Sequence, residues 1–215
     1  MLVMILLTAS VQAGVVIGGT RIIYPEDKKA VSLTVMNSNT SGVYLVQSWI
    51  ESDEPGKLSP FIISPPLFRI GSGEENILRI VFVGGVLPQD RESVFWLNVK
   101  SIPAVEDNSL SDNALQMVVK SRIKLFYRPA ELPGTPESCW QNLQVSHEGK
   151  RLIIKNSGAY YVSLYSLRVD GKEYDDVSMI PPKGNVVLTV KQASRLVWRA
   201  INDYGGIAPE VHRQL

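Results

Sequence analysis

The chain has 215 residues, of which 45% are hydrophobic and 20% are charged, so it can bury real cores and divide into two domains of roughly a hundred residues each. Its 22 basic and 21 acidic side chains leave a net charge of +1, which excludes binding to nucleic acid or to an anionic membrane through overall charge. The one cysteine, Cys139, excludes an internal disulfide, so hydrophobic cores must stabilise the domains.

Residues 1–13 form a short apolar run that ends in Val11-Gln12-Ala13, a small-residue pattern typical of signal peptidase cleavage. The run is too short to span a bilayer with polar flanks. It also lacks the Lys or Arg expected before a signal core, which favours a true start further upstream. We therefore expect a signal peptide over 1–13, export of the chain, and no membrane insertion.

From Gly14 onward, segments rich in Val, Ile, Tyr and Phe alternate with turn clusters, which indicates short β-strands. We see no convincing amphipathic helix. About seven antiparallel strands suit a sandwich of the immunoglobulin class, so the predicted fold class is all-β. The predicted strands of the first half cover residues 15–25, 31–37, 44–51, 61–70, 76–83, 93–102 and 115–127.

The segment 115–129 has the clearest pattern of all. Leu115, Met117 and Val119 begin a row of apolar side chains on alternate positions, with mostly polar or basic residues between them. At about 3.3 Å per residue this strand would run ~40 Å, far beyond the usual ~5–6 residues. A strand that outruns its own sheet leaves backbone groups and apolar side chains unpaired. We therefore expect this edge to be covered internally or to pair with another chain.

A segment rich in proline and glycine, residues 128–136, follows this strand and cannot continue a ladder. We place the domain boundary there, with a first domain over 14–130 and a second over 131–215. The second half is predicted to be a smaller β-sandwich. The tail beyond Gly206 is short, so the sequence leaves open whether a terminal strand covers the edge of this domain. The predicted strands of this half cover residues 143–156, 160–169, 185–191 and 195–203.

The sequence lacks motifs for catalysis. Two histidines and one cysteine are widely separated and offer no metal-ligand spacing, and no G-x-S-x-G elbow, P-loop or dinucleotide fingerprint occurs. The adjacent carboxylates Asp175 and Asp176 lie in a predicted loop and are typical of solubilising charges. We therefore expect no enzyme, no catalytic residue, no cofactor and no metal.

Five motifs, in the right order, resemble those of one known family. They are Thr20-Arg21-Ile22-Ile23-Tyr24-Pro25, Ser64-Pro65-Pro66-Leu67-Phe68-Arg69, Leu87-Pro88-Gln89-Asp90-Arg91-Glu92-Ser93, Ile123-Lys124-Leu125-Phe126-Tyr127-Arg128-Pro129 and Ile201-Asn202-Asp203-Tyr204-Gly205-Gly206. With these motifs the chain resembles the PapD-like periplasmic pilus (fimbrial) assembly chaperones of the chaperone–usher pathway, of the short-loop type. The resemblance implies two immunoglobulin-like β-sandwich domains arranged in an L with a cleft between them. It also implies donor-strand complementation, in which the chaperone lends a strand to a pilus subunit that lacks its last one.

The resemblance assigns roles to particular residues. Leu115, Met117 and Val119 would be the donor-strand side chains that enter the groove of the subunit, where each contributes about 1.5–3 kcal/mol before ordering costs. Arg21 and Lys124 would anchor the terminal carboxylate of the subunit. Alternation puts Lys124 on the opposite side of the strand from Leu115. We infer that twist or a change of environment along the strand reconciles these two roles.

Three further residues are implied to link the two domains. Glu92 from the first domain, Arg128 beside the linker and Asp203 from the second would form interdomain ion pairs that set the angle between the domains. The implied location is the periplasm, and the implied partners are pilus subunits and an outer-membrane usher. A self-capping dimer is a candidate state of the free protein.

Other interpretations of these residues stay open. On alternation alone, the apolar row would be ordinary core, and isolated Arg21 or Lys124 would be solvated surface residues. The alternative functions are a structural pilus subunit or adhesin and a generic exported immunoglobulin-like binding module. A subunit should carry an alternating extension after the signal peptide, often a cysteine pair, and a single domain. Failure of any pilus subunit to co-purify would favour the generic module.

Overall fold

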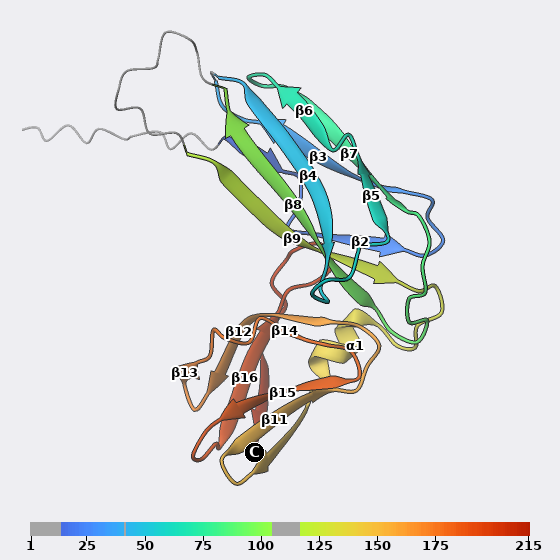
Figure 1. Ribbon diagram of the computed structural model, residues 1–215. Helices are drawn as coiled ribbons and strands as arrows, with labels where there is room; N and C mark the ends of the chain where they lie inside the picture. The colour runs from blue at the N-terminus through green and yellow to red at the C-terminus, as the bar shows by residue number, and fades with distance from the viewer. Residues whose placement is uncertain (1–13, 41, 105–116) are drawn as a thin grey trace, which may run out of the picture.

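A computed structural model describes residues 14–40, 42–104 and 117–215, and its regular structure is almost entirely β (Figure 1). The predicted signal peptide over 1–13 and the predicted donor residue Leu115 lie outside these described residues. The buried hydrophobic side chains form two separate clusters, one in each half of the chain. Figure 1 shows the corresponding two β-sandwiches, which meet end to end at an angle.

Two sheets pack face to face in the first sandwich. The first sheet has the order β1 (Val15–Ile17), β3 (Val31–Asn37), β7 (Glu75–Phe82), β5 (Phe61–Ser64). The second has the order β2 (Arg21–Pro25), β9 (Val119–Arg128), β8 (Ser93–Pro103), β4 (Tyr44–Ser52), β6 (Leu67–Ile70). All neighbours pair antiparallel except β2 and β9, which are parallel. The two sheets with crossing connections make this an immunoglobulin-like sandwich, as predicted.

Two segments that we predicted as single strands each contribute two strands, one to each sheet. Residues 15–25 divide into β1 and β2 at Gly18-Gly19, and residues 61–70 divide into β5 and β6 at Pro65-Pro66. Proline removes a ladder donor and glycine weakens a strand, so both pairs interrupt pairing. At these points the chain crosses from one sheet to the other.

The core of the first sandwich is built from alternating positions of these strands. Leu78 and Ile80 of β7 and Leu97 of β8 are fully buried, and the aromatic rings of Tyr24 and Phe61 pack edge to face with centroids 5.1 Å apart. The Tyr24 hydroxyl oxygen accepts a hydrogen bond from the Phe82 backbone N–H at 3.1 Å, so its polar atom is paired. This core supports the sheet that carries β9 and β2.

The second sandwich is smaller. One sheet has the order β10 (Gln144–Glu148), β11 (Arg151–Asn156), β15 (Gly184–Thr189). The other has the order β13 (Lys172–Glu173), β12 (Val162–Val169), β16 (Arg195–Ala200), β17 (Val211–Gln214), and β14 (Met179–Ile180) also pairs with β12. The question left open for the tail beyond Gly206 is answered by β17, which pairs with β16 and places Val211 opposite Trp198. This edge strand uses only four residues of the tail, Val211–Gln214.

A short helix, α1 (Pro136–Gln141), was not predicted. The Thr135 side chain caps it by accepting from the Ser138 backbone N–H, and the Ser138 side chain accepts from the Thr135 backbone N–H. We interpreted the prolines here only as strand breakers, although proline also suits the first turn of a helix. Cys139 and Trp140 of α1 are buried in the second core.

Candidate functional site

Strand β9 has two halves that differ in their neighbours. On one side it pairs with β8 from Val119 to Tyr127. On the other side its partner β2 reaches only from Lys124 to Arg128. Within the described part of the chain, residues 119–123 therefore have no strand beside them on that side. We call these five residues the open half of β9; Figure 1 shows β9 along one margin of its sheet.

The odd-numbered side chains of β9 pass from a buried to an exposed environment along one face. Leu125 is 0% exposed in the core of the first sandwich, whereas Val119 is 53% exposed. Met117, which precedes the strand, is 71% exposed. All three side chains are on the same face of the strand, but only Leu125 packs into the core of the sandwich. The apolar row can therefore be exposed at one end of the strand, while Lys124 lies on the opposite face near the other end.

Arg21 and Lys124 lie directly beside each other as register partners in the parallel pair of β2 and β9. Arg21 donates a hydrogen bond through Nη1 to the Ile201 backbone oxygen at 3.1 Å, and its buried Nε has no partner. No carboxylate of the described residues lies within 4.0 Å of either cation. The two side chains thus form a partly buried pair of like charges without an acidic partner.

The environment of this pair disfavours its positive charges. Burial, and next the charge of Arg21, lower the pKa of Lys124 to about 8. Burial also lowers the pKa of Arg21, against the opposing charges of Asp203 and Glu92. An anion placed between the two cations would relieve this cost, so the pair is suited to hold a carboxylate.

A cleft of about 460 Å³ lies between the two sandwiches, and Arg21 is one of the residues that line it. Phe126 of β9 and Tyr161 of the second sandwich face it, with ring centroids 5.5 Å apart. The exposed Tyr204 lies on the second-domain side of the same cleft. The first domain thus supplies a cation and an aromatic ring to this cleft, and the second domain supplies further aromatic rings.

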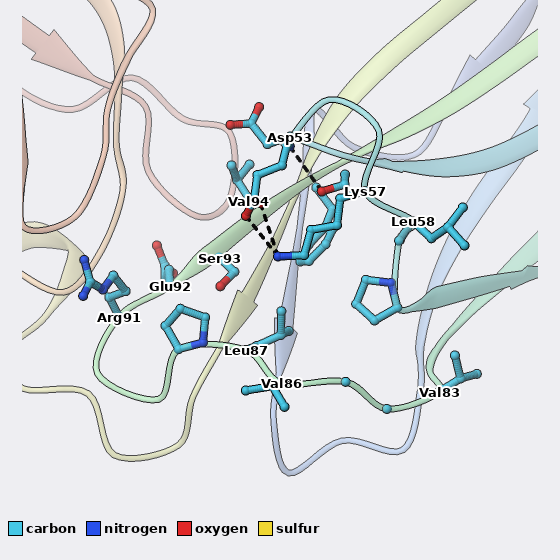
Figure 2. Close-up of a pocket in the computed structure, with 18 of the residues that line it drawn as sticks. Asp53, Lys57, Leu58, Val83, Val86, Leu87, Arg91, Glu92, Ser93 and Val94 are labelled. Atoms are coloured by element: carbon cyan, nitrogen blue, oxygen red, sulfur yellow. Dashed lines mark hydrogen bonds and ion pairs between the residues drawn. The ribbon is translucent and has the colours of Figure 1, made fainter.

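A larger pocket of about 860 Å³ lies between the β4–β5 and β7–β8 loops (Figure 2). Figure 2 shows the apolar side chains of Leu58, Val83 and Val86 along it. Its two cations are already paired, because Lys57 contacts Glu54 at 3.2 Å and Arg91 contacts Asp90 at 3.0 Å. We place the candidate site at Arg21 and Lys124 because their charges lack such partners.

The structure places Glu92, Arg128 and Asp203 together at the junction of the domains. Arg128 Nε lies 2.7 Å from Glu92 Oε1, and Arg128 Nη1 lies 2.7 Å from Asp203 Oδ2. The second carboxylate oxygen of Asp203 accepts from Arg128 Nη2 at 3.0 Å, so that pair is bidentate. The exposed fractions of the Glu92, Arg128 and Asp203 side chains are 2%, 19% and 32%.

Glu92 is held by the second domain at two further points. Its Oε2 accepts from the Tyr161 backbone N–H at 2.8 Å, and its own N–H donates to the Ala159 oxygen at 2.9 Å. Burial raises the pKa of Glu92 even though Arg128 and the Tyr161 N–H oppose this change. Burial alone would lower the pKa of Arg128, but Asp203 and Glu92 raise it, so the guanidinium stays charged. Glu92 is therefore a buried connection between the domains.

We predict that Glu92→Ala lowers the free energy of unfolding by about 2–4 kcal/mol, because it leaves the Arg128 Nε–H and the Tyr161 N–H without their acceptor, while Asp203 still pairs with the Arg128 charge. Urea unfolding followed by intrinsic fluorescence measures the change. Asp90→Ala is the matched control, since it removes the exposed interdomain pair of Asp90 and Lys183 at 2.5 Å. We expect a much smaller shift there. Equal unfolding midpoints for Glu92→Ala and the wild type would contradict the prediction.

Several contacts at the site could not be read from residue types. The bond from Arg21 to the Ile201 oxygen and that from the Tyr161 N–H to Glu92 involve backbone atoms, for which a sequence gives no signal.

In the described ranges, no group of three His, Cys, Asp or Glu side chains is placed to hold a metal. Nor does any described helix have the length and apolarity needed to cross a bilayer.

Comparison with known proteins gives matches along both sandwiches. Residues 14–133 match the N-terminal domain of PapD, a pili and flagellar-assembly chaperone, and residues 138–212 match the C-terminal domain of the PapD pili assembly chaperone. The chaperone protein LpfB of Salmonella typhimurium is 39% identical over 201 residues, which cover 91% of this chain and 87% of that relative. The chaperone protein FimC of Escherichia coli O6:H1 is 39% identical over 203 residues, which cover 93% and 84%.

Solved structures agree with these matches. A chain of the complex between the Salmonella enterica SafA pilin and the SafB chaperone superposes with a TM-score of 0.84 at 32% identity, covering 94% of this chain and 96% of that one. The periplasmic chaperone SfaE superposes with a TM-score of 0.80 at 39% identity, covering 94% of this chain and 100% of that one. These matches favour an assembly chaperone over the alternative of a structural pilus subunit.

Proposed function

The chain belongs to the PapD family of pilus assembly chaperones, and from this premise we propose that it captures pilus subunits by lending them the open half of β9 while Arg21 and Lys124 hold the subunit's terminal carboxylate. The strand that the subunit does have at its C-terminus would run along the open edge, where no described strand pairs with β9. Met117 and Val119, together with Leu115, would enter the groove that the subunit lacks a strand to fill. We propose no catalytic step.

One observation carries this proposal: the unpaired edge of β9 ends at the unpaired cations. The partner strand β2 begins opposite Lys124, so the open half stops where Lys124 and Arg21 stand side by side. A subunit chain anchored there by its carboxylate would therefore meet free backbone groups immediately upstream of its terminus. Anchor and edge together define the register in which the subunit strand pairs.

The outward face of β9 shows why Lys124 in particular suits the anchor. This face carries the side chains at every second position of the strand, which are Lys120, Arg122 and Lys124. Lys120 lies over the Trp49 ring and Arg122 over the Trp96 ring. Of these three cations, only Lys124 faces another cation instead of an aromatic or acidic partner among the described residues. Its charge is the one left for a ligand.

Co-expression tests the proposal directly. The chain is exported together with the pilus subunit encoded beside its gene, and the two are purified through a tag on the chain. We expect an equimolar soluble complex that keeps the subunit from aggregating. Failure of the subunit to co-purify, with the chain itself folded, would instead favour a generic binding module.

Subunit capture should weaken as the pH rises through 8. A bound carboxylate favours the protonated Lys124, whose pKa in the free chain is lowered to about 8 by burial and by Arg21. Below that pH the lysine is already charged, so affinity should be flat; from pH 7 to pH 9 it should fall by about tenfold. Calorimetric titration of the subunit measures this change.

The matched control for this pH dependence is Lys124→Arg, because a guanidinium stays charged up to pH 9. We expect the variant to bind with an affinity that is nearly constant between pH 7 and pH 9. An equal loss of affinity in the wild type and in Lys124→Arg would show that another group titrates.

We also propose where the chain works and to whom it passes its subunit. A signal peptide over 1–13 would direct the chain to the periplasm, and an outer-membrane usher would receive the chaperone–subunit complex. The open half of β9 could pair with a second copy in the absence of subunit, which would give a self-capping dimer. Sedimentation of the free chain, with and without subunit, measures this dimer.

A further inference from the structure

Besides its backbone pairing with β8, the open half of β9 is attached to its sheet by a group of side chains on its outward face. Trp49 of β4, Trp96 of β8 and Arg122 of β9 come from three adjacent strands. We call the whole group the tryptophan clamp. Its members are Trp49, Glu51, Asp53, Trp96, Lys120 and Arg122.

Two cations of β9 stack on the two indole rings of the clamp. Arg122 Cζ lies 4.1 Å from the centroid of the Trp96 ring, and Lys120 Nζ lies 5.0 Å from the centroid of the Trp49 ring. Both distances are within the range of attractive cation–π contacts. The Arg122 stack ties the open half to the adjacent strand β8, and the Lys120 stack ties it to β4, the next strand beyond β8.

Carboxylates fix the orientation of both rings. The Trp49 Nε1–H donates to Glu51 Oε1 at 2.8 Å, and the Trp96 Nε1–H donates to Asp53 Oδ1 at 2.8 Å. Glu51 Oε2 also lies 3.7 Å from Arg122 Nη2, so one carboxylate contacts both a ring and a cation. The two stacks are thereby joined into one network across β4, β8 and β9.

The tryptophan clamp lies on the opposite face of β9 from the apolar row. It holds the even-numbered side chains of the open half, on the face opposite to Met117 and Val119. The apolar row and the free backbone edge are left untouched. A strand that pairs with β8 on one side only is held less firmly than a strand with two neighbours, and any ordering during binding would cost affinity.

We propose that the tryptophan clamp consists of positioning residues, which hold the open half of β9 extended before a subunit strand arrives. This inference rests on the proposed function, since it assumes that the open half is the segment lent to the subunit. The clamp would act on the rate of capture: a strand that is already extended accepts its partner without first having to be ordered.

A double-mutant cycle on Arg122 and Trp96 tests the clamp. Arg122→Gln removes the cation and keeps most of the stem, and Trp96→Leu removes the ring and keeps the charge. We expect each variant to raise the hydrogen-exchange rate of the amides in 119–123 that bond to β8 by about fivefold, and the double variant to add little to either. Exchange in β11 of the second sandwich should not change, which separates local loosening from global unfolding.

The same variants are then tested for capture of the pilus subunit encoded beside the gene, diluted from denaturant into chaperone. We expect the association rate to fall by about fivefold in Arg122→Gln and to recover in Arg122→Lys, which can stack again. The matched control is Lys100→Gln, a neutralisation on β8 directly opposite Lys120. It should stay within about twofold of the wild type, since charge alone is changed there.

The outcomes separate the clamp from the proposed function. Unchanged exchange in 119–123, or an unchanged association rate in a chain where Lys124→Ala loses capture, overturns the clamp and leaves donor-strand capture in place. An equal loss of rate in Lys100→Gln and Arg122→Gln also overturns it, because net charge would then explain both. Full capture by Lys124→Ala overturns the proposed function and with it this inference.

Discussion

Lys124→Ala is expected to abolish capture of pilus subunits and to leave the chaperone folded. Lys124 lies beside Arg21 and is within 4.0 Å of no carboxylate of the described residues, so the free protein loses no ion pair with it. In the complex, however, the subunit's terminal carboxylate would lose one of its two cations. Removing one partner of a close charge pair at an interface should weaken binding by about a hundredfold or more. Calorimetry or pull-down of the co-expressed subunit measures the loss.

Lys124 is a cleaner test than Arg21. Arg21→Ala should also abolish capture, but it removes the hydrogen bond to the Ile201 oxygen and could change the angle between the domains. Lys100→Ala serves as the control, because it deletes a lysine of the same sheet that lies opposite Lys120 and is not a register partner of Arg21 or Lys124. Wild-type subunit yield with Lys124→Ala would refute the carboxylate anchor, and loss of yield with Lys100→Ala would point to net charge instead.

The fold follows from the sequence because strand patterns are local. Alternation in residues 115–127 predicted a strand, and β9 runs from Val119 to Arg128. Patterns do not show where a partner strand ends, however. The open half depends on β2 beginning only at Arg21, after Gly18-Gly19 has moved the chain from one sheet to the other. That crossing is a property of the tertiary structure.

The candidate site was predictable in its charges but not in its neighbours. Motifs placed Arg21 and Lys124 among the candidates, and register then brought them side by side. By contrast, alternation within β4 and β8 could place the Trp49 and Trp96 rings on the outward face, but nothing local shows that each ring meets a cation of β9. The contact joins residues far apart in sequence, so it is visible only in the folded sheet.

Met117→Asp is expected to weaken subunit capture by about a hundredfold without affecting the stability of the free chaperone. Met117 is 71% exposed, so a carboxylate there stays in water as long as no subunit is bound. In the complex the same carboxylate would enter an apolar groove with no partner for its charge. An ionised carboxylate moved from water into such a site must lose its hydration or take up a proton, and both cost free energy. Calorimetric titration of the subunit measures the difference.

Two further variants separate charge from size at this position. Met117→Leu keeps an apolar side chain of similar volume and should bind within about threefold of the wild type. Met117→Gln is polar but uncharged, so its affinity should lie between those of Met117→Leu and Met117→Asp. If all three variants bound equally well, residue 117 would remain in water in the complex. The lent segment would then have to begin further along β9, nearer to Lys124.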